Sequence, residues 1–159
     1  MQEIYYLSVL IITAGFAVYD NRHRRVPNKA LILFLPVAFA APFINTIAEN
    51  PVFTETYSFA PALAYASLGA AAGFIILLSS ALISKNGNGI GGGDIKLAAV
   101  LGFIYGVTGI IYILIISSFL AMAAGLYIQR KSGNRVLRLP FVPYIFAGVL
   151  AVTIFGFIQ

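Results

Sequence analysis

The chain has 159 residues, which is enough for about one domain. Charged types make up 9% of it and apolar types 60%, whereas a soluble domain is typically about one quarter charged, so an ordinary soluble fold is excluded. No cysteine is present, which excludes disulfides, thiol nucleophiles and zinc–thiolate sites. The net charge of +5 does not indicate a nucleic-acid partner, because the basic residues lie between apolar runs and follow membrane topology instead.

Four uncharged runs are each long enough to predict a membrane span. In chain order they cover residues 4–19, 30–48, about 60–83 and about 139–158. A short, strongly basic loop, residues 19–29, separates the first two spans. The segment 49–59 contains no basic residue, so we expect it on the opposite side of the membrane.

The uncharged run of residues 97–129 is too long for one crossing. Its 33 residues would form a helix of about 50 Å, well beyond the ~30 Å hydrocarbon core of a bilayer. Basic residues flank both ends, so the positive-inside rule predicts two short helices that turn near residues 106–109. We therefore predict an all-α integral membrane protein, a bundle of about six transmembrane helices in a single domain of residues 1–159. Both termini would lie outside, and all ten Lys and Arg residues would lie at the cytoplasmic face.

The only two aspartates, Asp20 and Asp94, are the candidate catalytic residues. Each lies at the edge of an apolar run, where an ionisable group is costly and therefore a functional candidate. The topology places both at the cytoplasmic ends of their helices. Two facing carboxylates share a proton and activate water for attack on an amide, one as base and the other as acid. Because Asp94 would begin a helix and Asp20 would end one, the helix dipoles favour Asp94 as the ionised member of the pair.

Simpler interpretations of the same residues stay open. Asp94 is interpretable as a helix cap, and Asp20 as a solvated partner of the neighbouring arginines. The glycines before Asp94 are interpretable as a flexible connector. Lys96 would then only extend to lipid phosphates, although its position one turn into the helix also allows it to tune Asp94.

Two pairs of glycines predict close approaches of the backbone. Gly69 and Gly73 share one face of the third span and predict close contact with another helix. Of Gly91 and Gly93, we expect at least one to have a positive φ or to let a substrate strand approach closely. A side chain at that position would displace Asp94.

The segment that contains Asp94 resembles a known motif. Gly91 and Gly93 directly before Asp94, followed by Lys96, resemble the GxGD motif of type IV prepilin peptidases. These are membrane aspartic proteases that remove leader peptides from pilin-like precursors. The resemblance implies a fold of the GxGD intramembrane protease type.

The resemblance extends from residue 19 to residue 143, in order. Asp20 followed by Pro27 and Asn28, and the late segment from Pro140 to Pro143, are similar to the same family. The resemblance implies Asp20 and Asp94 as the catalytic pair, with no metal and no cofactor.

The basic loop departs from the long members of the family. Those carry a cytoplasmic insertion after the first helix, often with cysteine pairs, and also methylate the new N-terminus. Here the loop has about ten residues and cysteine is absent, so the chain resembles a short form without the N-methyltransferase insertion. Such forms serve tight-adherence pili or archaeal flagellin-like filaments.

The predicted location and partners follow from these features. We expect a multi-pass protein of the cytoplasmic membrane that cuts a pilin-like precursor at the cytoplasmic boundary. The precursor would present a short basic leader, a glycine before the cut as the resemblance implies, and then an apolar helix. We expect Arg22, Arg24 and Arg25 to fix topology and bind anionic membrane lipids rather than substrate.

Other classes of protein share some of these features. Proteases of the presenilin and signal-peptide-peptidase class also combine Tyr-Asp with GxGD, but they are longer and have a different late proline motif. A small transporter or channel subunit would use Asp20 and Asp94 as ion or proton sites, which are expected near the bilayer midplane rather than at its edge. A purely structural membrane subunit is the third alternative.

Overall fold

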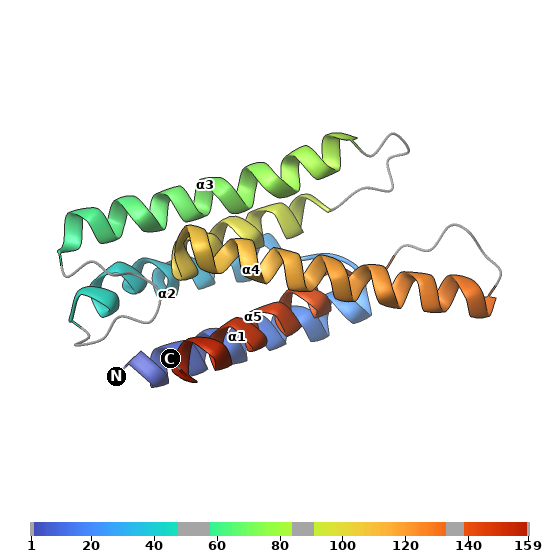
Figure 1. Ribbon diagram of the computed structural model, residues 1–159, viewed down its shortest axis with the longest axis horizontal. Helices are drawn as coiled ribbons and strands as arrows, with labels where there is room; N and C mark the ends of the chain where they lie inside the picture. The colour runs from blue at the N-terminus through green and yellow to red at the C-terminus, as the bar shows by residue number, and fades with distance from the viewer. Residues whose placement is uncertain (1, 48–57, 84–90, 133–138, 159) are drawn as a thin grey trace.

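The computed structural model describes residues 2–47, 58–83, 91–132 and 139–158, and these residues form helices joined by short segments (Figure 1). The helices are α1 (Gln2–His23), α2 (Asn28–Ile47), α3 (Phe59–Ile83), α4 (Gly92–Ser132) and α5 (Val142–Ile158). Helices α1 to α4 are each long and apolar enough to cross a membrane by length and composition, and α5 is a shorter apolar helix. The predicted all-α membrane fold is confirmed, and the predicted spans agree with the helices to within a few residues. The loop predicted at residues 49–59 lies largely outside the described residues.

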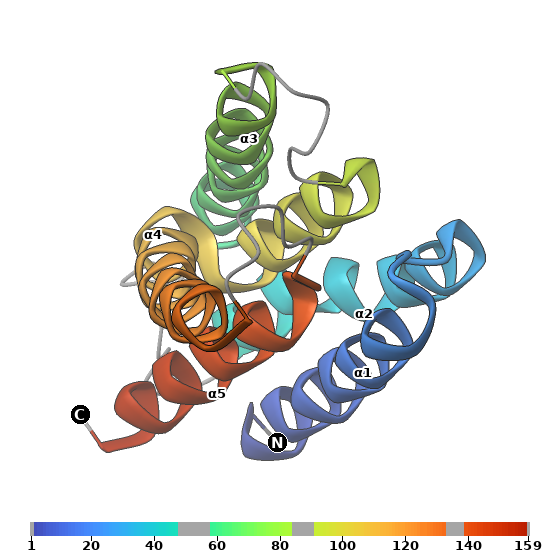
Figure 2. The same ribbon diagram turned by 90° about the vertical axis from the view of Figure 1, so that its right-hand side faces the viewer.

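The described residues form five helices rather than the predicted six or so, because the two short helices predicted within residues 97–129 are counted together as α4. They are separated at Gly106, which has a non-helical φ of 67° and ψ of −173°. A Cβ added to Gly73 of α3 would lie 2.5 Å from the carbonyl oxygen of Ala98 and 3.1 Å from Cγ1 of Ile110. In a straight helix those two residues would be about 18 Å apart. Helix α4 therefore folds back on itself at Gly106, where the sequence predicted a turn (Figures 1 and 2).

The reversal in α4 is stabilised by a tyrosine from α3. The ring of Tyr65 occupies the space beside Gly106 in which a Cβ would lie. Its hydroxyl oxygen accepts the main-chain N–H of Thr108 at 3.1 Å and is hydrogen-bonded to the Thr108 hydroxyl at 2.5 Å. Only glycine adopts the left-handed region at little cost, so the turn depends on Gly106 itself. We call residues 92–105 the first arm of α4 and residues 107–132 its second arm.

The first arm of α4 is the centre of the bundle. Viewed along the bundle in Figure 2, it lies between α3, α2, α5 and the second arm. Its residues Leu97, Leu101 and Tyr105 are completely buried. The predicted close contact of Gly69 and Gly73 is also confirmed, since both face the first arm. Small residues let the two backbones touch, which is how helices gain packing energy where no water is displaced.

Gly69→Ala should lower the stability of the bundle markedly, because the new methyl would overlap the carbonyl oxygen of Gly102 and the backbone of Gly106. Backbone cannot rotate away as a side chain does, so we expect a loss of about 1–3 kcal/mol or more. Thermal unfolding in detergent measures the change. Gly15→Ala is the matched control, because a Cβ there meets nothing within 4 Å. Equal stability of the two variants would contradict this account of the α3–α4 contact.

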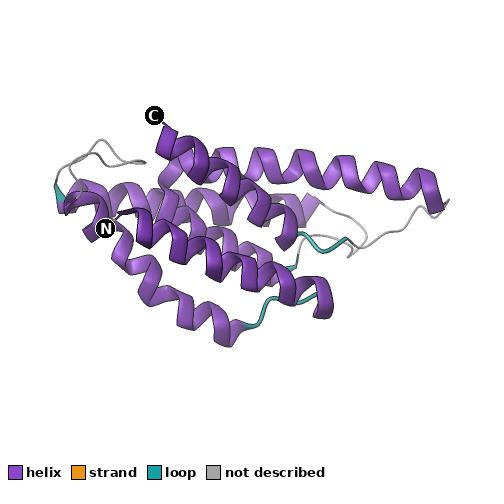
Figure 3. Ribbon diagram, turned by 90° about the horizontal axis from the view of Figure 1, so that it is seen from below, coloured by secondary structure: helices purple, strands orange, loops and turns teal. Residues whose placement is uncertain are grey.

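Both chain termini lie at one end of the bundle (Figures 1 and 3). The opposite end is formed by the ends of α1 and α3, the beginning of the first arm and the end of the second arm of α4, and the beginnings of α2 and α5. The described basic side chains belong to this second end; they are Arg22, Arg24, Arg25, Lys29, Lys96, Arg130 and Lys131. The described acidic residue Glu3 lies at the first end, in the first turn of α1. Charge is therefore strongly asymmetric along the bundle axis.

Candidate functional site

The two aspartates meet at the basic end of the bundle. Asp20 lies in the last turn of α1 and Asp94 in the first turn of α4. Their side chains are 4% and 9% exposed, and they lie close enough for their charges to interact. The fold therefore brings together two carboxylates that are 74 positions apart in the chain. A buried pair of this kind is a candidate for acid–base chemistry.

The carboxylate of Asp94 is fixed by the beginning of its own helix. The carbonyl oxygen of Gly91 accepts the N–H groups of Asp94 and Ile95 at 3.0 and 3.3 Å, so Gly91 is the N-cap residue. The Asp94 carboxylate in turn accepts the main-chain N–H of Gly91. This is the half of a capping box in which the side chain of the third helical residue bonds back to the N-cap N–H; glycine has no side chain to supply the other half. The interpretation of Asp94 as a cap is thus correct locally, and the same bond holds the carboxylate in place.

The carboxylate of Asp20 is fixed by a different helix. Its Oδ2 accepts the main-chain N–H of Val142, the first residue of α5, at 3.3 Å. Within the described residues it forms no ion pair with an arginine, and it is buried. The interpretation of Asp20 as a solvated partner of neighbouring arginines is therefore wrong.

Helix dipoles do not distinguish the two aspartates as the sequence suggested. Asp94 accepts an N–H at the beginning of α4, and Asp20 accepts one at the beginning of α5. Both carboxylates thus lie at a helix N-terminus, where an anion is stabilised. The order in which the pair loses its protons stays a prediction.

A left-handed residue ends α1 just after Asp20. The main-chain N–H of Arg24 donates to the carbonyl oxygen of Asp20 at 2.7 Å, and Arg24 has a φ of 51°. This is the left-handed cap that commonly ends helices, usually with glycine at the position that Arg24 occupies. The chain then passes directly to α2 through a connection of only four residues, 24–27.

Val26 in this connection explains the need for glycine at position 93. A Cβ on Gly93 would lie 2.7 Å from Cβ of Val26 and 3.3 Å from its carbonyl oxygen. Gly93 does not have a positive φ. The close approach of a substrate strand stays a prediction; the segment that lies against Gly93 in the structure is Val26 of the same chain. A Cβ at Gly91 would be in ordinary contact with the Asp94 carboxylate, at 3.5 Å.

Three further predicted residues lie around the same contact. The ammonium group of Lys96 donates to Oδ1 of Asn28 at 3.1 Å, which ties the first arm of α4 to the beginning of α2. The carbonyl oxygen of Pro27 accepts the N–H of Leu31 at 3.2 Å, and Pro27 immediately precedes α2. Together these contacts hold the α1–α2 connection over the beginning of α4.

The late prolines flank the residue that bonds Asp20. Pro140 precedes α5 and Pro143 is its second residue, and both are half-buried. Sequence reasoning identified these prolines but not Val142 between them. Val26 and Arg24 were also missed as structural residues, since a valine beside a proline and an arginine in a basic loop carry no distinct signal.

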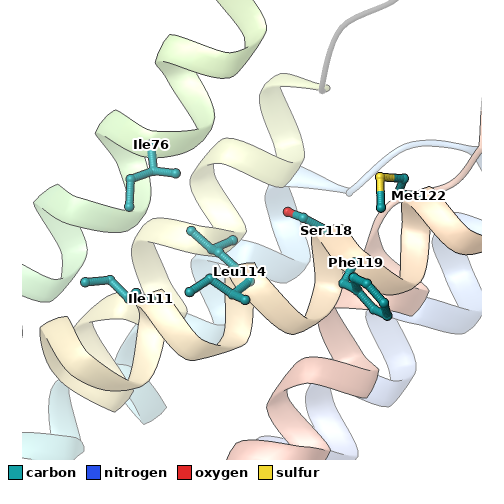
Figure 4. A pocket seen from close by; sticks show the side chains of 7 residues that line it. Ile76, Ile111, Leu114, Ser118, Phe119 and Met122 are labelled. Carbon is teal, nitrogen blue, oxygen red and sulfur yellow. The ribbon is translucent and has the colours of Figure 1, made fainter.

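Other features of the described residues lie away from the aspartates. No group of three or more His, Cys, Asp and Glu side chains in the described ranges is arranged to hold a metal ion. A groove of about 450 Å³ lies between α3 and the second arm of α4 (Figure 4). Its lining is apolar apart from one hydroxyl; the residues are Ile76, Ile111, Leu114, Ile115, Ser118, Phe119 and Met122. None of them is a predicted site residue, and such a lining suits contact with hydrocarbon.

Comparison with known proteins identifies relatives over most of the chain. The prepilin leader peptidase/N-methyltransferase of Bacillus subtilis (strain 168) is 36% identical over 157 residues, covering 96% of this chain and 55% of the relative. The prepilin leader peptidase/N-methyltransferase of Xanthomonas campestris pv. campestris is 35% identical over 132 residues, covering 79% of this chain and 41% of the relative. The chain thus spans about half the length of the curated relatives it matches. No solved structure matches it.

A family model matches a continuous part of the chain that includes both aspartates. The matched region is residues 4–126, and the model describes the type IV leader peptidase family. It contains Gly91, Gly93 and Lys96 as well, and it ends before the late prolines. Since the match covers well over half of its residues, the chain belongs to the type IV leader peptidase family.

Proposed function

We propose that this chain is a membrane aspartic endopeptidase that removes the leader peptide from type IV pilin-like or archaeal flagellin-like precursors. The observation that carries the proposal is the buried pair of Asp20 and Asp94, held at one end of the bundle in a chain of this family. Both curated relatives are named as prepilin leader peptidases, which supports the substrate class.

The chemistry follows from a pair that shares one proton. Close carboxylates do not both ionise, so one is a base and the other an acid. The base takes a proton from a water molecule, whose oxygen forms a bond to the scissile carbonyl carbon. The acid gives its proton to the carbonyl oxygen. The C–N bond then breaks as the leaving nitrogen takes up a proton from the pair and one hydroxyl proton of the tetrahedral intermediate returns to the pair, so that an acid and an amine are released and the pair again holds one proton.

The orientation of the protein sets the kind of substrate. The described basic side chains gather at the same end as the aspartates, which supports, by the positive-inside rule, a cytoplasmic location of this end with both termini outside. A precursor with a short basic leader in the cytoplasm and an apolar helix in the bilayer then brings its scissile bond to the aspartates. A glycine before the cut suits a site enclosed by the ends of α1, α4 and α5.

The positions of the aspartates also favour a protease over a transporter. A transport carboxylate is expected near the middle of its helix, at the bilayer midplane. Asp20 is three residues from the end of α1, and Asp94 is the third residue of α4. We propose peptidase activity alone, without N-methylation, because the α1–α2 connection is short and the chain contains no cysteine.

Co-expression with a designed precursor tests this function. The precursor carries a short Lys-rich leader, a glycine, an apolar helix of about 20 residues and a periplasmic or extracellular tag. We expect membranes that contain the full chain to shorten the precursor at the glycine and to leave an unmethylated N-terminus, as mass spectrometry of the product shows. A matched precursor with leucine in place of that glycine should be cut poorly. An uncut glycine precursor, with both proteins in the membrane, would contradict the proposal.

A further inference from the structure

The first turn of α5 presents one main-chain N–H group to Asp20. N–H groups at the beginning of a helix lack partners in a preceding turn. Among residues 142–145, Pro143 has no N–H, and the N–H groups of Tyr144 and Ile145 donate to the carbonyl oxygen of Phe141 at 3.0 and 3.1 Å. The remaining N–H, on Val142, donates to Oδ2 of Asp20. Of the four residues, Val142 is therefore the one whose main-chain N–H donates to the Asp20 carboxylate.

Contacts further along α5 fix its position along the bundle axis. A Cβ on Gly148 would lie 2.5 Å from Oγ of Ser117 and 2.6 Å from the carbonyl oxygen of Ile113, so α5 lies directly on the second arm of α4. One turn later, the hydroxyls of Thr153 and Tyr105 are hydrogen-bonded at 2.8 Å. A shift of α5 by one residue would move its first N–H by about 1.5 Å, enough to break the bond to Asp20.

The negatively charged form of the Asp20 carboxylate is stabilised by a hydrogen-bond donor such as the N–H of Val142. Asp20 lies near the C-terminus of α1, whose dipole disfavours an anion, and beside the second carboxylate of Asp94. The N-terminus of α5 has the opposite dipole, and a hydrogen bond to a charged group is stronger than one between neutral groups. Val142 is completely buried, at 1% exposed, so water does not compete strongly for its N–H.

We propose that the main-chain N–H of Val142 is a positioning group of the active site. It orients the Asp20 carboxylate toward Asp94 and stabilises its charged form, and the segment from Pro140 to Pro143 serves to present it. The inference rests on the proposed function, because it gives Val142 a part in a reaction that the aspartates perform. Its effect is on the reaction step rather than on substrate binding.

Replacement of the peptide bond before Val142 by an ester tests the proposal, since an ester has no N–H but nearly the same shape. The full chain with the hydroxy-acid analogue of valine at position 142 is assayed on the designed glycine precursor. We expect kcat to fall roughly ten- to hundredfold, as for the loss of a hydrogen bond to a charged group, with KM little changed. Val142→Pro removes the same N–H at a helical position that tolerates proline, and its kcat should fall at least as far. Val142→Ala keeps the N–H and loses only side-chain packing, so its kcat should fall much less.

Each outcome of this experiment is decisive for the role of Val142. An ester variant that is folded and has the kcat of the wild type overturns the proposal, whatever Val142→Pro does. An equal loss in the ester and in Val142→Ala also overturns it, because packing would then be responsible. The Asp20→Asn variant, assayed in parallel, separates this failure from failure of the proposed function. If Asp20→Asn still cuts, the proposed function is wrong; if only the ester still cuts, the inference about Val142 alone is wrong.

Discussion

Asp20→Asn and Asp94→Asn should each abolish leader removal while the protein still inserts and folds. Asparagine has nearly the volume of aspartate but neither takes nor gives the proton, and acid–base catalysis typically contributes about 10²–10⁴-fold in rate. Among the described residues the other carboxylate is that of Glu3, at the far end of the bundle, so none is available to replace either aspartate. Cleavage of the designed precursor, measured with equal amounts of membrane-inserted protein, gives the result.

Glu3→Gln is the matched control for the two aspartate variants. It neutralises a carboxylate in the first turn of α1, at the end of the bundle away from the aspartates, and should cut at the rate of the wild type. Normal processing by either Asp→Asn variant would exclude the protease function. Asp→Glu at each position, followed across pH, tests whether the two aspartates lose their protons in a fixed order; identical profiles at the two positions would contradict any such order.

Gly93→Ala should inactivate the protein, whereas Gly92→Ala should leave it active. A methyl at position 93 would lie 2.7 Å from Cβ of Val26, while one at position 92 meets nothing within 4 Å. Relief of the overlap requires the beginning of α4 and the α1–α2 connection to separate, and this moves Asp94 relative to Asp20. Misplacement of a reacting group by about 1 Å can cost about 10²-fold in rate. The two variants have the same composition and lie in the same helical turn, so the comparison isolates the contact.

Val26→Ala in the Gly93→Ala background provides a second check on this contact. The smaller side chain keeps the Cβ atom but removes the two methyl groups that hinder its movement, so cleavage should recover in part. Cleavage assays and thermal unfolding on Gly92→Ala, Gly93→Ala and the double variant separate misplacement of Asp94 from unfolding. Loss of activity in Gly92→Ala equal to that in Gly93→Ala would show that the requirement for glycine does not arise from Val26.

The helices were predictable from the sequence because hydropathy measures how each segment transfers into hydrocarbon. Residues 60–83 were predicted as a span, and α3 is Phe59–Ile83. The need for two crossings in 97–129 followed from length and flanking charge, and Gly106 was within the predicted turn. The two predicted crossings are the two arms of α4, so the count of five differs from six only because both arms carry one label.

The contacts between helices were less predictable, because apolar side chains lie on all faces of these helices and do not mark which face packs against a neighbour. Gly69 and Gly73 indicated a close contact but not that Gly102 and Ala98 would be the partners. The aspartates were identified because ionisable groups are rare in such a sequence. Val142 acts through its main-chain N–H, which every residue except proline carries, so no residue type marks it. The prolines on either side of it were the only indirect signal.

The unequal arms of α4 have a consequence for the lipid around the protein. The first arm, residues 92–105, has 14 residues, about 21 Å of helix, whereas the second arm, residues 107–132, has 26 residues, about 39 Å. A hydrocarbon core is about 30 Å thick, so the first arm is short by about 9 Å when its reversal lies at the outer face. A bilayer meets a short span by thinning, at a cost of fractions of a kcal/mol per Å. The short first arm should therefore thin the bilayer around it. Because Asp94 lies at the beginning of this arm, the length of the surrounding acyl chains should affect how easily water reaches Asp94. The same sequence should therefore work at different rates in membranes of different thickness.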